Sequence, residues 1–166
     1  LIAHGRDRAD AIRRLRAALA ATPLLGLRHN ARFLRELLDH AVFRCGEMTT
    51  QLLDEWQQGA EPLMQRPVAS DEDWCLAAAA FALREGAVQR PESAAAYDLP
   101  LALDGQRRTP RVRLQRDGSV SITLDGAAHA LRLLGVPDRE LHNEWDGVAR
   151  RTVVLWQGRV LHLARE

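Results

Sequence analysis

Lysine is missing from this sequence: all 23 basic residues among the 166 are arginine. A chain without a side-chain amine cannot form a Schiff base, supply the lysine of a P-loop or carry an amide-linked prosthetic group. These three kinds of chemistry are therefore excluded for residues 1–166.

Cysteine, long apolar runs and net charge are also scarce. Cys45 and Cys75 are the two cysteines, and since nothing indicates an oxidising compartment, we expect both to be reduced in a cytoplasmic protein. No apolar stretch reaches the roughly 20 residues that a membrane-spanning helix needs, and no signal-peptide pattern occurs. A net charge of +1 gives no strong attraction to nucleic acid or to a membrane. We therefore expect neither as a partner.

The first part of the chain, residues 1–57, has helical periodicity. Asp7 is placed to cap a helix in which apolar residues recur at helical spacing between residues 12 and 19. Pro23 forces an exit from this helix, and Leu24–Leu27 is short and apolar enough for a strand. Asn30 can then cap a second helix.

The chain begins at Leu1, inside the apolar segment Leu1–Ala3, which has the length of a strand stub. With the strand expected at Leu24–Leu27, this stub gives an α/β pattern at the edge of a larger sheet. We therefore expect residues 1–166 to be a fragment of a longer polypeptide.

Segment 58–69 is rich in Gln, Gly and Pro, and we interpret it as a linker between domains at 1–57 and 70–166. Ser70 stands three residues before Asp73, an arrangement that can cap a helix. The following run, Trp74–Leu83, contains no charged residue, and Gly86 can end the helix. A helix that is apolar on every side must be surrounded by other elements, and this one is too short to cross a membrane.

The sequence after this helix predicts antiparallel strands. Apolar residues alternate with polar ones in 112–114 and 120–124, on either side of Asp117-Gly118, a dipeptide preferred in type I′ hairpins. Similar turn signals separate strands expected near 127–134, 139–145, 148–156 and 159–164. The predicted fold class is α+β, with an antiparallel β-barrel wrapped around the central apolar helix.

Several polar groups invite a catalytic or metal-binding interpretation. The six histidines lack the spacing of a compact ligand set, so we interpret them as structural or surface residues. Asp71, Glu72 and Asp73 could perform acid–base chemistry, but they fall in the first turn of the apolar helix, where negative charge favours the helix dipole. We therefore expect these carboxylates to have a structural role.

A run of arginines offers the strongest rival to a purely structural interpretation. Five positive charges without an intervening acid occur at Arg107, Arg108, Arg111, Arg113 and Arg116. They can form a solvated strand face, a patch that contacts a protein, or a surface for single-stranded nucleic acid, as in OB-folds. The last mode also requires aromatic side chains on which bases stack.

Three stretches in the first 57 residues have recognisable patterns: "LIAHGRDRADAIRRLRAAL", with its glycine, arginine and apolar residues, and then "GLRHNARFL" and "FRCGEMTT". Together they resemble the end of a biotin carboxylase C-terminal domain. The matching positions in the second and third stretches are Gly26, Asn30, Phe33, Leu34, Phe43, Gly46 and Thr50.

Residues 70–166 resemble the domain that follows biotin carboxylase in α subunits of the 3-methylcrotonyl-CoA and geranyl-CoA carboxylase type. The alanine-rich helix, "DGSVSI" and "DGVARRTVVLWQGRVLHLARE" carry this resemblance. It implies a mediating (BT) domain, in which an antiparallel barrel surrounds a helix and binds the carboxyltransferase β subunit. The remainder of the α subunit would be the second partner.

The resemblance implies that the parent enzyme uses biotin, ATP and Mg or Mn to carboxylate an acyl-CoA. The ATP-binding elements and the biotinyl lysine would lie outside residues 1–166, so the chain would be a non-catalytic bridge without a cofactor site. A partner-binding hook is expected at Val88–Leu99, with Arg90, Glu92 and Tyr97 as candidate contacts. A solvated crossover loop is the alternative for this segment.

Overall fold

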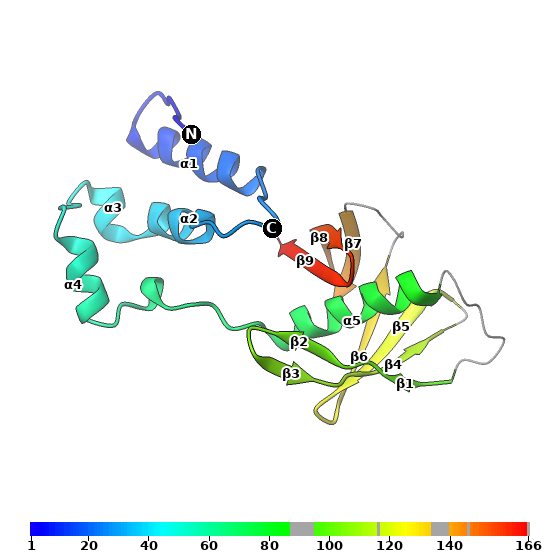
Figure 1. Cartoon of the computed structure of the whole chain (residues 1–166). Coiled ribbons are helices and arrows are strands. Elements are labelled where there is room, and N and C mark those ends of the chain that lie inside the picture. The colour runs from blue at the N-terminus through cyan, green and yellow to red at the C-terminus, as the bar shows by residue number, and fades with distance from the viewer. Residues whose placement is uncertain (87–94, 116, 134–139, 146, 166) are drawn as a thin grey trace. The chain divides into compact units, whose positions relative to one another are not determined.

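The computed structural model of the chain describes residues 1–86, 95–115, 117–133, 140–145 and 147–165. These residues form two compact units, Leu1–Pro67 and Val68–Glu166 (Figure 1). The boundary between the units falls within the segment 58–69, where a linker is expected from the sequence.

The N-terminal unit is helical. Its elements are α1 (Arg8–Ala20), α2 (Ala31–Asp39), α3 (Ala41–Cys45), α4 (Leu52–Gln58) and the 3₁₀ helix η1 (Pro62–Met64). The predicted cap of α1 is confirmed, because the Asp7 carboxylate accepts a hydrogen bond from the Asp10 backbone N–H. Asn30 precedes α2 but makes no side-chain capping bond; instead, His29 Nδ1 accepts from the Ala31 N–H.

The expected α/β pattern of this unit is wrong. All of residues 1–67 are described, and they contain no strand, either at Leu24–Leu27 or at Leu1–Ala3. A short apolar segment becomes a strand only when a neighbouring strand accepts and donates its backbone hydrogen bonds. Leu24 and Leu27 are instead 47% and 71% exposed.

The C-terminal unit consists of one long helix, α5 (Asp71–Gly86), and a series of strands. The strands are β1 (Tyr97–Asp98), β2 (Leu101–Leu103), β3 (Gln106–Arg108), β4 (Arg111–Leu114), β5 (Ser119–Leu124), β6 (Ala127–Leu133), β7 (Glu140–Trp145), β8 (Val148–Gln157) and β9 (Val160–Arg165). Helix α5 begins as predicted: Ser70 N donates to Asp73 Oδ2 over 2.8 Å, and Asp73 N donates to Ser70 Oγ. Among the described residues, no helix is long and apolar enough to cross a membrane.

Seven of these strands form one antiparallel sheet in the order β1-β4-β5-β6-β7-β8-β9, and β2 pairs with β3 in a separate hairpin. The strands predicted after residue 126 are confirmed as β6 to β9. A turn with positive φ at both Asp125 (49°) and Gly126 (88°) joins β5 to β6, the conformation of a type I′ hairpin. The predicted α+β class with an antiparallel sheet is therefore confirmed.

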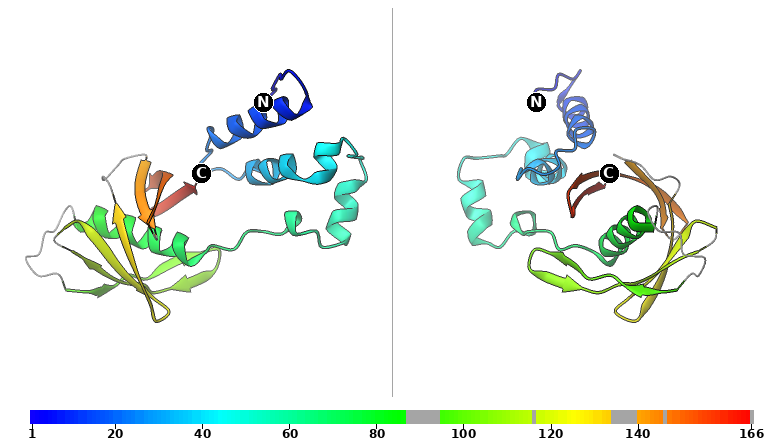
Figure 2. Two further views of the ribbon diagram at one scale, coloured as in Figure 1. Left: turned by 180° about the vertical axis from the view of Figure 1, so that it is seen from behind. Right: turned by 45° about the vertical axis from the view of Figure 1, so that its right-hand side comes forward.

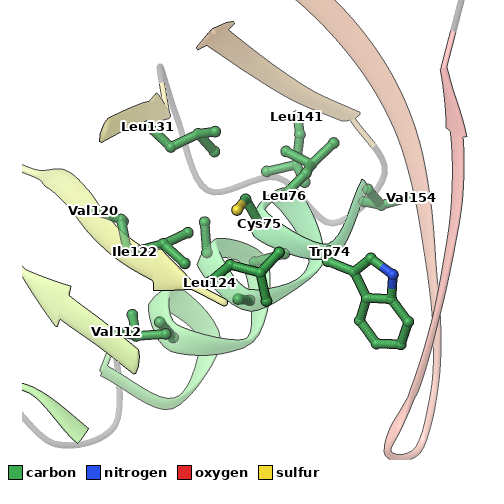
Figure 3. Close-up of a cluster of buried hydrophobic side chains, with 14 residues drawn as sticks. Trp74, Cys75, Leu76, Val112, Val120, Ile122, Leu124, Leu131, Leu141 and Val154 are labelled. Atoms are coloured by element: carbon green, nitrogen blue, oxygen red, sulfur yellow. The ribbon is translucent and has the colours of Figure 1, made fainter. Parts of the chain in front are cut away.

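The sheet curves around α5, which lies in its concave side (Figure 2). Among the described strands, β1 and β9 are the sheet edges and no pairing joins them, so the predicted closure into a barrel is not confirmed. Buried side chains of α5 and the sheet make one core, drawn in Figure 3. The apolar helix was expected to be surrounded, and its residues Trp74, Leu76 and Ala78 are buried, whereas Phe81 and Leu83 are partly buried.

Candidate functional site

The segment expected to form a hook lies mostly outside the described residues. Arg90 and Glu92 fall there, so the structure gives no position for these two candidate contacts. Tyr97, the third candidate, lies in β1 opposite Val112 of β4 and is partly buried against the core. Its ring is therefore used at least in part by the fold of the domain itself.

The arginine run does not form one continuous surface. Arg111 and Arg113 lie on the outer face of β4, whereas Arg108 in β3 binds the carboxylate of Asp71 on α5. Asp98 lies 3.8 Å from Arg111, and Arg116 is outside the described residues.

The side chains next to these arginines on the outer face of the sheet are small. The register places Arg113 beside Ser121 and Ala130, and Arg111 beside Thr123 and Ala128. Tyr97, Trp145 and Trp156, the aromatic residues described after β1 begins, pack against the core instead. The stacking platform that single-stranded nucleic acid requires is thus not found on this described face.

The carboxylates at the start of α5 make a network of ion pairs with three different strands. Asp71 binds Arg108 of β3, with 2.5 Å between Oδ1 and Nη1. Glu72 Oε2 lies 2.8 Å from Nη1 of Arg150 in β8 and 2.6 Å from Nη1 of Arg165 in β9. Asp73 also binds Arg165, over 2.9 Å.

These contacts show a structural role for the acidic turn. The hydrogen bond that Arg108 donates to the Asp71 carboxylate raises the pKa of Arg108 above its already high ordinary value, so this arginine is permanently charged. Every carboxylate of the turn faces a guanidinium, which leaves no free acid–base pair in the turn. Arg150 and Arg165 could not be identified as the partners from the sequence, because they lie far from the turn along the chain.

The other end of α5 is held by an aromatic cluster. The rings of Phe81 and Trp156 meet edge to face, with their centroids 4.9 Å apart. The Arg84 guanidinium lies 4.2 Å from the Trp156 centroid and donates a hydrogen bond to the Gly158 carbonyl. Strands β8 and β9 are thus attached to both ends of the helix.

The core also contains polar groups without an evident chemical use. Thr152 and Asn143 are fully buried, and a long hydrogen bond of 3.4 Å runs from the threonine hydroxyl to the asparagine amide oxygen. Both cysteine thiols are free. Burial, with a smaller effect of the Asp71 charge, raises the pKa of Cys75 to about 12, so this thiol stays protonated and is a poor nucleophile.

The histidines serve local structural purposes where their contacts are known. His40 Nδ1 accepts from the Val42 N–H at the start of α3, and its ring lies 4.6 Å from that of Trp56. His129 stacks on Trp145, with centroids 4.9 Å apart. The described part of the chain has no group of three or more side chains suited to hold a metal ion.

The first turn of α1 accounts for the glycine, aspartate and arginine pattern near the N-terminus. A Cβ added at Gly5 would lie only 2.3 Å from the backbone nitrogen of Ala11, so glycine is required for this close approach. Asp10 is buried and forms ion pairs with Arg13 and Arg14. The hydrogen bond from Arg13, followed by that from the Arg6 backbone, lowers the pKa of Asp10 to about 2.

The motifs later in this unit also have identifiable roles. Arg8 reaches the end of α3, where its guanidinium donates to the Phe43 and Arg44 carbonyls. The same guanidinium lies 5.1 Å from the centre of the Phe43 ring. Gly46 ends α3 in a left-handed conformation, with φ of 80°. These contacts join the first motif of the unit to its last.

The N-terminal unit is similar to a domain of known proteins. Residues 1–55 match the family model of the biotin carboxylase C-terminal domain. The chain is 33% identical over 73 residues to a pyruvate carboxylase subunit of Methanothermobacter thermautotrophicus, a stretch that covers 44% of this chain and 15% of that protein.

A second relative is the alpha chain of an acyl-CoA carboxylase. The chain is 31% identical over 91 residues to the mitochondrial propionyl-CoA carboxylase alpha chain of Rattus norvegicus, which is 54% of this chain and 12% of that protein. The chain thus spans only a small part of the length of both curated relatives. It resembles the biotin carboxylase C-terminal region of biotin-dependent carboxylases.

Proposed function

We propose that this chain belongs to the α subunit of a biotin-dependent acyl-CoA carboxylase, where it joins the biotin carboxylase region to the carboxyltransferase β subunit. The observation that carries the proposal is the order of its two units. A segment similar to the biotin carboxylase C-terminal domain is followed by a separate unit in which a curved antiparallel sheet holds an apolar helix. The second unit would be the mediating domain, which binds the β subunit.

The names of the two relatives support a role within an assembly, since both denote one polypeptide of a larger carboxylase. We further propose that the parent enzyme is of the 3-methylcrotonyl-CoA or geranyl-CoA carboxylase type and acts in the cytoplasm.

In this proposal the chain has no catalytic step of its own. The parent would use biotin, ATP and Mg or Mn, but the residues present do not fit these groups. Biotin attachment requires a lysine and the sequence has none, and the described residues have no cluster of metal ligands. The remainder of the α subunit would therefore carry these cofactors.

Residues 88–96 are the proposed hook, with Arg90 and Glu92 as the contacts to test. Tyr97 is less suited to anchor a partner, because it pairs in β1 and packs on the core. A replacement that stops before Tyr97 should therefore leave the fold intact.

Co-purification with the carboxyltransferase β subunit from the same genome tests the proposal. The unmodified chain should retain the β subunit, and a chain with a Gly/Ser linker at 88–96 should fold normally but lose the β subunit. Tyr97→Phe is the matched control and should bind as the unmodified chain does. Binding that persists in the linker variant would place the interface elsewhere on the C-terminal unit. Failure of the unmodified chain to bind the β subunit would contradict the bridging role.

A further inference from the structure

The C-terminal unit has an open seam on one side of α5. Strand β9 pairs only with β8 in the described structure, and β2 and β3 pair only with each other. No described backbone hydrogen bond between strands crosses from the β2–β3 hairpin to β9. The open side of the curved sheet is visible in Figure 2. The two sides of this seam must be held by something other than sheet pairing.

Both sides of the seam are attached to the same turn of α5. Arg108 comes from β3 and binds Asp71, while Arg165 comes from β9 and binds both Glu72 and Asp73. Arg150 of β8 adds a second contact to Glu72, through both carboxylate oxygens. The helix turn therefore takes the place of the missing strand pairing.

The ion pairs also cover an aromatic side chain. The Arg108 guanidinium lies 5.6 Å from the centre of the Trp74 ring, and Trp74 is only 3% exposed. Figure 3 shows its indole pointing away from the other labelled side chains of the core. If Arg108 leaves Asp71, this ring loses part of its cover.

We propose that these ion pairs are an electrostatic latch that closes the seam, so that ionic strength controls a local opening of β2–β3 and β9 away from the start of α5. The far end of the helix is held differently, by the contact of Phe81 with Trp156. Because apolar contacts are not weakened by salt, the opening stays confined to the acidic end.

The paired side chains are exposed enough for dissolved ions to screen their attraction. The side chains of Asp71 and Asp125, which flank Arg108, are 62% and 71% exposed, whereas that of Glu72 is 12% exposed. Exposed pairs are strongly screened, and partly buried pairs less so. The Arg108 side should therefore open first and the β9 side should follow at higher salt.

Amide hydrogen exchange of the full chain, followed by mass spectrometry at low salt and in about 1 M NaCl, tests the latch, because at about 1 M the screening length falls to about 3 Å. Salt should speed exchange in peptides from β2–β3 and β9, roughly tenfold or more relative to peptides from β5. Glu72→Gln should produce the β9 change already at low salt. The control Glu140→Gln removes the exposed ion pair with Arg151 and should leave β9 unaffected.

Two outcomes would overturn the latch. One is exchange that speeds up equally in β5 and β9, since this would show global destabilisation. The other is β9 exchange in the parent chain that does not respond to salt. The second measurement needs no variant, so the test stands even if Glu72→Gln does not fold.

Discussion

The C-terminal unit buries the 14 apolar side chains drawn in Figure 3 in one cluster, whereas in the N-terminal unit the buried apolar residues are Leu37, Leu38 and Trp56. The N-terminal unit also leaves large apolar side chains exposed, among them Ile2 and Leu27. Burial of apolar area is the main favourable term in folding. The difference predicts that the C-terminal unit has the larger and more stabilising apolar core of the two.

The largest effect is expected from a charge placed in the core of the C-terminal unit. Ala78 is fully buried on α5, and Ala78→Glu would bury a carboxylate without a partner, at a cost of several kcal/mol. Calorimetry should show loss of the cooperative transition of this unit. Ala128→Glu, the same substitution at an exposed position of β6, should melt close to the parent. Similar melting of both variants would refute the central-helix architecture.

Truncation of a core leucine should reduce the free energy of unfolding more in the C-terminal unit than in the N-terminal unit. Leu76 is fully buried in the large cluster, so Leu76→Ala should cost about 3 kcal/mol. Leu37 is 8% exposed in a thin layer between short helices, so Leu37→Ala should cost clearly less. Urea unfolding monitored by hydrogen exchange measures each unit separately. A larger cost at Leu37 would mean that the N-terminal unit has the stronger core.

A smaller effect is expected at Gly5, where an added methyl group would meet backbone atoms rather than a flexible side chain. Gly5→Ala should destabilise the start of α1 by about 1–3 kcal/mol, because the backbone must shift to admit the Cβ. Exchange of the α1 amides should become faster, with β5 unchanged as the internal reference. Unchanged α1 protection would show that the loop around Gly5 adapts freely.

The smallest effect is a pH dependence confined to the N-terminal unit. The pKa of Asp10 falls from its ordinary value of 3.8 to about 2 in the folded state. Its contribution to stability is therefore complete above about pH 4 and is lost as the pH falls toward about 2. Far-UV circular dichroism between these values should show α1 loosening in the parent. Asp10→Asn should remove this part of the titration, and an identical titration in the variant would exclude Asp10 as its source.

Features set by neighbouring residues could be predicted from the sequence. The caps at Asp7 and Ser70 depend on side chains three residues apart, and the strands of the C-terminal unit follow from alternation and Asp-Gly turns. The hairpin β2–β3 was not predicted, although Asp104-Gly105 marks its turn with positive φ at both residues. Its strands are three residues each, too short for alternation to stand out.

Features that depend on distant parts of the chain could not be predicted. The segment Leu24–Leu27 has the composition of a strand, but the unit supplies no strand to pair with it. Arg108 belongs by sequence to a basic run, yet it faces α5 because alternate side chains of a strand point to opposite sides. The partners of Glu72 come from β8 and β9, and only the curvature of the sheet brings them to the helix.

Isothermal titration of the full chain with the carboxyltransferase β subunit tests the proposed bridging role most directly. The account predicts saturable binding with a Kd of about 1 μM or tighter and a negative heat-capacity change from buried apolar surface. Leu37→Ala, which affects only the N-terminal unit, should leave this affinity unchanged. Absence of saturable heat at β-subunit concentrations of about 100 μM would contradict the account.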